Sequence, residues 1–311
     1  MKKTNSILTK ILAAVLVIYI FSVIFANKER SKPRALESAL LNPKYESEIK
    51  KIVISKINIQ GNEEEAISIL RHGDFFLASS NTLCTVADSK IIHALLERVL
   101  KVRSLYKISD KDDYKKNGRE YVNFSFLGAN DTVCSNVQFF DENMLTGRIT
   151  VTSDSATDMY ETENDFNQFL SCDINYWSEG LIAPEIKKPV QLLFQEGKKP
   201  RFSIDEKSEK FLSVSETVLA IRHGRISAAV DFGAASSTLW LSDESGRIAR
   251  IEFFESSDAA FDGEKSYFYR KTVTPSAFDS QENAFSFYSE NALYEISLWT
   301  YEKIKNALSQ P

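Results

Sequence analysis

Two Arg-His-Gly tripeptides are the residues of this 311-residue chain with the clearest potential for chemistry. Residues 71–73 and 222–224 each match a motif in which histidine accepts a phosphoryl group and arginine neutralises the phosphate. That reaction needs a second histidine and further arginines in one pocket, whereas the remaining histidine, His93, falls in an amphipathic segment. We favour the alternative, in which each tripeptide forms a tight turn between two strands and its glycine supplies a positive φ.

A calcium loop is the second candidate, at residues 109–118. Asp113 and Asn117 fit the first and fifth ligand positions of such a loop. Lys115 occupies the third position, and Phe124 stands where a bidentate glutamate is required, so the motif fails. The chain also has no Gly-x-Ser-x-Gly elbow and no glycine-rich phosphate loop. We therefore predict no catalytic, cofactor-binding or metal-binding residue.

The three cysteines, Cys84, Cys134 and Cys172, do not form a recognisable site. Their separations of 50 and 38 residues resemble no zinc spacing, and an odd number does not make a disulfide framework. We expect three buried thiols that behave as small apolar side chains, with oxidation of one pair as the alternative.

The strongest signal in the sequence is an apolar run near the N-terminus. Ile11–Ala26 carries no charge, and with Ile7 and Leu8 the apolar stretch covers residues 7–26. As a helix it would be about 30 Å long, which is the thickness of a bilayer core. A cleaved signal peptide is the alternative, but Ile24 stands where the cleavage site needs a small residue. We expect an uncleaved single-pass anchor.

Charge indicates how the rest of the chain is placed. Basic residues flank the apolar run on both sides, so they do not decide its orientation. A short basic tail normally stays in the cytoplasm, which favours an inner-membrane protein whose bulk faces the periplasm or the cell exterior. Residues 1–34 hold seven of the 38 basic residues and one of the 43 acidic residues, so the remainder has a net charge of −11. Such a body is a poor nucleic-acid binder.

The periodicity after the anchor predicts an α+β fold of antiparallel sheets with packed helices. Asp88 is the expected N-cap of a long helix, because apolar residues follow it at helical spacing. The predicted elements are a strand at 52–59, a hairpin at 66–79, a helix at 88–105, strands at 121–127, 132–140, 148–152 and 158–162, and a helix at 165–173.

The second half of the chain resembles the first. After a basic crossover predicted at 187–201, three segments match earlier ones in the same order: 217–230 with 66–79, 246–254 with 131–140, and 285–304 with 159–177. This predicts two related lobes, of which the second is a degenerate repeat that lacks the long helix. The predicted division is a tail and anchor at 1–27, a tether at 28–48, a first lobe at 49–185 and a second lobe at 186–311.

An aromatic cluster in the second half has two interpretations. It contains Trp240, Phe253, Phe254, Tyr267 and Tyr269. It could form a partner surface, but we favour a sheet packed on helices, because aromatic side chains dominate ordinary cores.

Residues 45–185 resemble the family called domain of unknown function 4340. The resemblance rests on the strand IVISKINI, on ISILRHGDFFLASS with Phe75 or Phe76 after the turn, and on Ala87-Asp88 opening a helix. A strand-then-helix segment, DMYETENDFNQFLSCDINYWSEGLI, ends with Leu181-Ile182. The tryptophan usual at the family's hairpin is absent. Members are typically bacterial, anchored by one N-terminal helix, and often occur with ABC transporters of the gliding-motility type. The resemblance carries over no catalytic residues.

These observations lead to a primary functional hypothesis and two alternatives. We expect a non-enzymatic, membrane-anchored accessory or scaffold protein of a bacterial envelope complex, with an integral membrane protein such as an ABC transporter as its partner and no cofactor. The first alternative is a domain that binds an envelope polymer or a small solute in a cleft between the lobes, near Trp240. The second is a histidine-phosphatase-like hydrolase built on His72 or His223.

Overall fold

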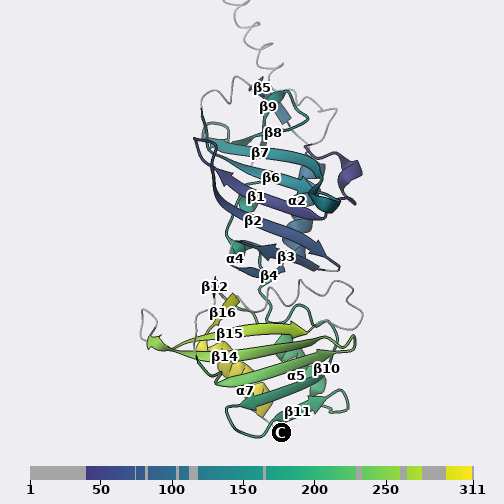
Figure 1. Cartoon of the computed structure of the whole chain (residues 1–311), viewed down its shortest axis with the longest axis vertical. Helices are drawn as coiled ribbons and strands as arrows, with labels where there is room; N and C mark the ends of the chain where they lie inside the picture. The colour runs from purple at the N-terminus through teal and green to yellow at the C-terminus, as the bar shows by residue number, and fades with distance from the viewer. Residues whose placement is uncertain are drawn as a thin grey trace, which may run out of the picture.

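The chain folds into two antiparallel sheets that lie one above the other along the long axis of the molecule (Figure 1). The predicted anchor lies outside the residues that this computed structural model describes. Within the described residues, no helix has the length and apolarity needed to cross a bilayer. The described residues are 40–73, 75–80, 83–102, 105–111, 118–163, 166–228, 233–259, 265–274 and 292–309.

The first sheet has nine strands in the order β4-β3-β2-β1-β6-β7-β8-β9-β5. All its neighbouring strands run antiparallel. The strands are β1 (Lys51–Ile57), β2 (Glu63–His72), β3 (Phe75–Ser79), β4 (Cys84–Ala87), β5 (Leu105–Asp110), β6 (Tyr121–Leu127), β7 (Val133–Asn143), β8 (Arg148–Ser153) and β9 (Asp158–Glu163). The helical elements of this half are η1 (Pro43–Tyr45), α2 (Ser89–Leu100), η2 (Ala129–Asp131), η3 (Asn167–Phe169) and α4 (Ile174–Trp177).

Alternation along the strands builds the first core. Ile52 and Ile54 of β1 are buried on the same face of the sheet, and they share one core with the apolar stripe of α2. Asp88 caps α2, since its Oδ1 accepts a hydrogen bond from the Lys90 amide at 2.8 Å. Leu40 and Leu41 are also buried in this core, so the folded part begins upstream of the boundary predicted at residue 49.

The second sheet has seven strands in the order β11-β10-β13-β14-β15-β16-β12. Helices α5 and α7 lie behind it in Figure 1, on the side where α2 lies behind the first sheet. The elements are β10 (Pro189–Glu196), β11 (Phe202–Asp205), α5 (Phe211–Leu219), β12 (Ile226–Ala228), β13 (Ser237–Asp243), β14 (Ile248–Ala259), β15 (Lys265–Thr274), β16 (Ala292–Ile296) and α7 (Leu298–Ser309). The prediction of antiparallel sheets with packed helices is confirmed.

The two sheets have the same strand order once the β3–β4 hairpin is set aside. The first then reads β2-β1-β6-β7-β8-β9-β5, which matches the second member by member. Each has one helix between its second and third strands, α2 or α5, and one after its last strand, α4 or α7. Two of three equivalent positions in cross-strand register carry the same side chain. Phe139 and Tyr160 of the first sheet correspond to Phe253 and Tyr294 of the second, with Val151 in the place of Tyr269.

This correspondence corrects one of the three predicted sequence matches. Residues 217–230 do not form a hairpin like 66–79, because α5 occupies 211–219 and only β12 follows. The prediction that the second half lacks the helix is therefore wrong: α5 takes the place of α2, and the missing part is the β3–β4 hairpin. Apolar residues recur at helical spacing in this stretch, at positions 211, 214, 218 and 221.

Three other boundaries also differ from the sequence prediction. The helix predicted at 88–105 ends at Leu100, and Leu105 begins β5. The helix predicted at 165–173 is replaced by the short helices η3 and α4. The crossover predicted at 187–201 is largely strand β10, which pairs with β11 and β13 inside the sheet. Local basic and proline residues were outweighed there by the apolar alternation of Val190, Leu192 and Phe194.

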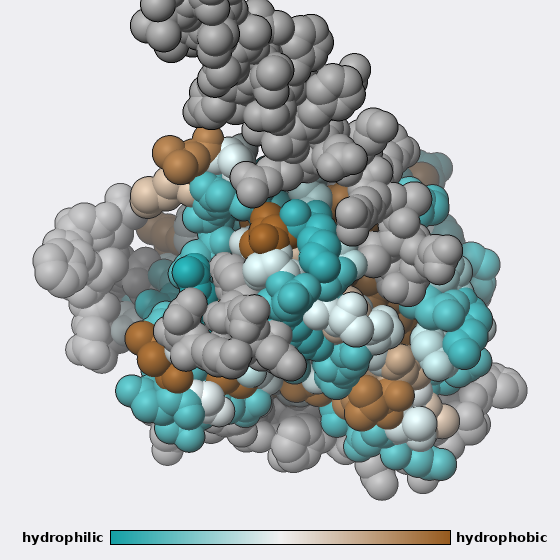
Figure 2. All heavy atoms as spheres, turned by 90° about the horizontal axis from the view of Figure 1, so that it is seen from above, coloured by the Kyte–Doolittle hydropathy of each residue, from teal (hydrophilic) through white to brown (hydrophobic). Residues whose placement is uncertain are grey.

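Seen from above, the end of the first lobe carries apolar side chains in small separate groups among hydrophilic ones (Figure 2). Met144 and Leu145, in the turn between β7 and β8, are 99% and 96% exposed. Scattered groups of this kind are usual on protein surfaces. In its described part, this face therefore shows no extended apolar patch.

Candidate functional site

The β3–β4 hairpin of the first lobe packs against the second lobe. Phe75 and Leu77 of β3, with Cys84 and Val86 of β4, belong to the hydrophobic core of the second lobe. Beside them, the hydroxyls of Thr85 in β4 and of a tyrosine in β16 form a buried hydrogen bond of 3.1 Å. The polar side chains around this bond are the candidate site, which we call the junction cluster: Thr85, Ser178, Glu185, His223, Tyr269, Lys271 and Tyr294.

A buried ion pair is the centre of the junction cluster. Lys271 Nζ of β15 lies 2.7 Å from Glu185 Oε1, and the two side chains are 1% and 0% exposed. Glu185 belongs to the segment that connects the two sheets, so the pair holds this connection against the second sheet. Removing two charges from water is costly, and such a pair persists only when each charge compensates the other.

Lys271 occupies a position that is ordinarily apolar. Its side chain lies on the same face of β15 as those of the buried Tyr267, Tyr269 and Val273, which face the helices. The cross-strand register places it opposite Ile251, and the equivalent residue of the first sheet, opposite Val137, is Ser153. The lysine is therefore a feature of the second lobe alone. A charged residue in the inward phase of a strand is the sequence signal that could have revealed it.

His223 lies in the loop between α5 and β12 and packs into the same cluster. Its Nδ1 donates to the carbonyl oxygen of Gly224 at 2.9 Å, which leaves Nε2, 3.2 Å from Ser178 Oγ, to accept from that hydroxyl. The ring lies edge-on to Tyr294, with 4.8 Å between centroids. Burial, assisted by the positive charges of Lys271 and Arg222, lowers the pKa of His223 to about 4. The imidazole is neutral at pH 7.

Two stacked tyrosines complete the cluster. The rings of Tyr269 and Tyr294 are 4.8 Å apart and inclined by only 9°. Burial raises the pKa of both phenols, so both stay protonated at any physiological pH. Within the described residues, the buried hydroxyl of Tyr269 has no hydrogen-bond partner. The cluster is therefore a tightly packed mixture of one ion pair, one imidazole and two phenols.

This arrangement suits a structural role better than catalysis. Ser178 and His223 form a serine–histidine pair, but Nδ1 of the histidine donates to a backbone carbonyl rather than to a carboxylate. A pKa near 4 makes the imidazole a weak base at pH 7. Cavities of about 110 and 210 Å³ lie in the described part of the first lobe, and other residues line them.

The structure separates the three histidines that a phosphotransfer site would need. His72 is buried at the end of β2, His93 is exposed on α2, and His223 is in the second lobe. Gly73 has a φ of +56°, which confirms the turn interpretation for the first Arg-His-Gly. That interpretation is wrong for the second tripeptide, which follows a helix and whose Gly224 is not in the left-handed region.

The predicted aromatic cluster is divided between the two faces of the second sheet. Phe253, Tyr267 and Tyr269 are buried on the face that packs against the helices. Strand alternation places Trp240 and Phe254 on the opposite face. There the guanidinium of Arg201 lies 4.9 Å from the centroid of the Trp240 ring.

The cysteines and the rejected calcium loop leave no metal site in the described part of the chain. All three thiols are free, and Cys134 and Cys172 are only half-buried, contrary to the expectation of three buried thiols. Burial raises the pKa of Cys84 to about 12, so it is an unreactive thiol. No group of three or more His, Cys, Asp or Glu side chains among the described residues is arranged to hold a metal ion.

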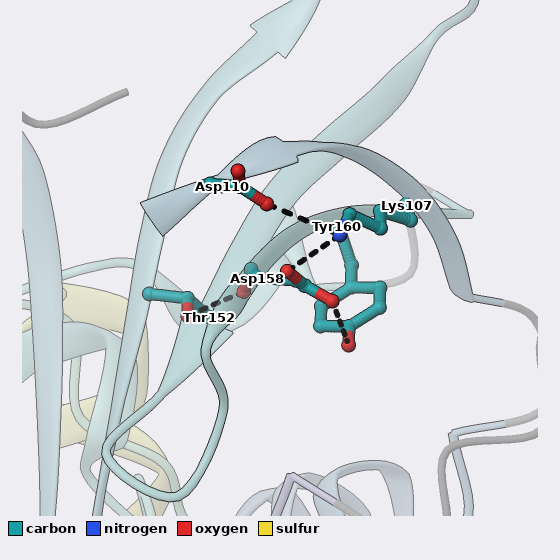
Figure 3. Close-up of polar contacts among 5 residues, drawn as sticks. All are labelled: Lys107, Asp110, Thr152, Asp158 and Tyr160. Atoms are coloured by element: carbon teal, nitrogen blue, oxygen red, sulfur yellow. Dashed lines mark hydrogen bonds and ion pairs between the residues drawn. The ribbon is translucent and has the colours of Figure 1, made fainter. Parts of the chain in front are cut away.

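Most of the loop at 109–118 lies outside the described residues, but Asp110 at its start is placed. Figure 3 shows Lys107 between the carboxylates of Asp110 and Asp158, at 3.1 and 2.7 Å. The hydrogen bond from Lys107 lowers the pKa of Asp158, and the same contact raises that of Lys107. Asp110 is therefore engaged in an ion pair on the surface of the first lobe.

Comparison with known proteins adds no relative to this picture. No family model matches the chain, and no curated protein or solved structure matches it significantly. The resemblance of residues 45–185 to domain of unknown function 4340 therefore stays a prediction.

Proposed function

We propose that this protein is a non-enzymatic, membrane-anchored accessory or scaffold protein of a bacterial envelope complex. The observation that carries the proposal is the junction cluster, in which Lys271 and Glu185 are buried as an ion pair between the connecting segment and the second sheet. A buried ion pair at the connection between the lobes suits a protein that presents a fixed shape to a partner. Separating the two charges inside the protein is costly, so the pair holds the connecting segment against the second sheet.

The matching strand orders support an origin by duplication of one α+β unit. Two sheets with the same seven-strand order and helices at the same two places are an improbable coincidence of topology. The duplicated unit gives an elongated body with a long lateral surface. Such surfaces suit binding of another protein better than enclosure of a small substrate.

The membrane part of the proposal rests on the apolar run at 7–26. Thirteen residues separate Ala26 from Leu40, whose side chain is already buried in the first core. Even fully extended, they span at most about 45 Å. A partner reached by the first lobe would then lie in the membrane or close to it, and an ABC transporter is the class that the family resemblance suggests.

The packing between the lobes favours this role over the alternative of a ligand in an interlobe cleft. The space between them is occupied by the apolar side chains of the β3–β4 hairpin and by the junction cluster. Trp240, near which the cleft was expected, lies on the face of the second sheet opposite the helices, beside the guanidinium of Arg201. The distribution of His72 and His223 over two lobes likewise disfavours a histidine-phosphatase-like hydrolase.

Affinity capture from membranes tests the proposal. The full-length tagged chain, at its native expression level, is extracted in mild detergent and isolated. We expect an integral membrane protein to be recovered with it in a fixed ratio. A chain with residues 7–26 replaced by a cleavable signal sequence is the control, and it should recover much less of the same partner. Isolation of the monomer alone would contradict the scaffold role.

Protease treatment of spheroplasts tests the orientation. If the bulk lies outside the cytoplasm, added protease should degrade both lobes in intact spheroplasts, while a cytoplasmic marker protein survives. Protection of the lobes until the membrane is lysed would place them in the cytoplasm instead.

A further inference from the structure

A cavity of about 110 Å³ opens at one end of the first core, and none of its lining residues belongs to the junction cluster. It lies between the sheet and α2, and the segment after η1 closes one side of it. Its floor is apolar and includes Ile52, Ile69 and Leu96. Its rim includes four basic side chains, Lys50, Lys51, Arg71 and His93.

Regular secondary structure places these basic groups beside an apolar floor. Arg71 follows the buried Ile67 and Ile69 in the inward phase of β2, so its side chain extends from the same face, at the point where the core ends. Its backbone amide donates to the carbonyl of Lys50 at 2.7 Å, which fixes the two residues beside each other. His93 stands three residues before Leu96 on α2, and its ring packs edge-on against Phe76.

The charges at the rim are incompletely compensated. Lys51 is paired with Asp131 at 3.2 Å, and Glu46 contributes one carboxylate to the lining. Among the described residues, no carboxylate lies within ion-pair distance of Lys50 or Arg71. Two cations without an acidic partner in the described part are notable, because the chain has 43 acidic and 38 basic residues. The positive charges of Lys50 and Arg71 can therefore be neutralised by a negatively charged ligand.

We propose that this cavity binds a small monocarboxylate with a short apolar tail. The carboxylate lies against Arg71 and Lys50, because a guanidinium matches the planar geometry of a carboxylate. The tail covers Ile52, Ile69 and Leu96, as in ligand sites that combine an apolar lining with a few polar groups. A dry cavity of about 150 Å³ holds benzene, so this smaller one accepts a tail of roughly four or five carbon atoms. Inorganic phosphate would leave the apolar floor unmatched.

Titration of the full-length protein in nanodiscs with sodium pentanoate tests the proposal, by calorimetry and by ligand-observed NMR. We expect saturable binding at one site, with the pentanoate methyl group closest to the protein. Acetate lacks the tail and 1-pentanol lacks the charge, so each should bind at least about tenfold more weakly than pentanoate. Binding of phosphate as tight as that of pentanoate would overturn the proposed ligand class.

Two substitutions locate the site, and a third is the matched control. Arg71→Gln should weaken pentanoate binding at least about tenfold, whereas Arg71→Lys should retain part of it. Leu96→Trp should fill the cavity and abolish binding. Arg225→Gln removes the same charge from an exposed loop of the second lobe and should leave the affinity unchanged. Thermal unfolding of each variant verifies the fold. Pentanoate binding that is insensitive to both Arg71→Gln and Leu96→Trp would refute the site.

Discussion

The ion pair between Lys271 and Glu185 is the residue-scale feature with the largest energetic consequence. Lys271→Met leaves the Glu185 carboxylate buried without its compensating charge, which costs about 3–5 kcal/mol in comparable pairs. We expect a loss of that size in the free energy of unfolding, measured by urea denaturation. The double variant Lys271→Met/Glu185→Leu should recover most of it, because both charges are then absent. A double variant as unstable as the single one would argue against compensation.

His223 makes stability depend on pH in a defined direction. Its pKa is about 4 in the folded chain and about 6.5 when exposed, so the unfolded chain binds the extra proton between these values. Stability should therefore fall as the pH is lowered from 6.5 to 4, by at most about 3 kcal/mol for this residue.

The variant His223→Gln isolates this effect from the carboxylates that titrate in the same range. Its urea midpoint should fall less than that of the unmodified chain between pH 7 and pH 5. Parallel pH dependences for the two proteins would show that His223 takes up its proton equally well in the folded state.

At the scale of elements, the two Arg-His-Gly tripeptides differ in backbone conformation. Gly73 joins β2 to β3 with a φ of +56°, whereas Gly224 lies outside the left-handed region, and a Cβ added there would meet only Glu295 O, at 3.6 Å. Gly73→Ala should therefore destabilise the fold by about 1–2 kcal/mol, because an L-residue is strained in that region. Gly224→Ala is the matched control and should change the melting temperature little. Equal effects would contradict the difference between the two turns.

The β3–β4 hairpin should stabilise the lobe that it does not belong to. Leu77 is 4% exposed and packs in the core of the second lobe, so Leu77→Ala should cost about 2–5 kcal/mol and accelerate amide exchange in β15 and β16. Leu70→Ala, at a 39% exposed position of β2, is the control and should leave that exchange unchanged. Faster exchange confined to the first sheet would show that the hairpin does not couple the lobes.

Elements with one strong period could be predicted from sequence, and elements with competing signals could not. The strand predicted at 121–127 matches β6, because alternating phenylalanines fix its inward face. For α5, the tripeptide that follows it and is shared with the first hairpin obscured the helical spacing of Phe211, Val214 and Val218. The junction cluster escaped prediction because its members come from distant segments, and only their pairing in three dimensions makes Lys271 tolerable.

For the whole molecule, the junction predicts a fixed distance between the lobes. Spin labels at Leu145→Cys and Leu212→Cys report it, since both positions are exposed, one in each lobe, once Cys134 and Cys172 are replaced by serine. We expect one narrow distance distribution by pulsed electron paramagnetic resonance. Adding Lys271→Met should broaden it, whereas Lys303→Met, on α7, should not. A broad distribution in the unmodified background would indicate lobes that move independently.

The β3–β4 hairpin belongs to the first of the two similar sheets, so the two ends of the molecule differ. Stacked repeats can in principle extend indefinitely when every unit offers the same two complementary ends. Here the first unit carries the projecting hairpin and the second receives it, but the described residues of the second contain no such hairpin. The described part of the second unit therefore offers no hairpin to another copy of the molecule, which disfavours end-to-end polymerisation.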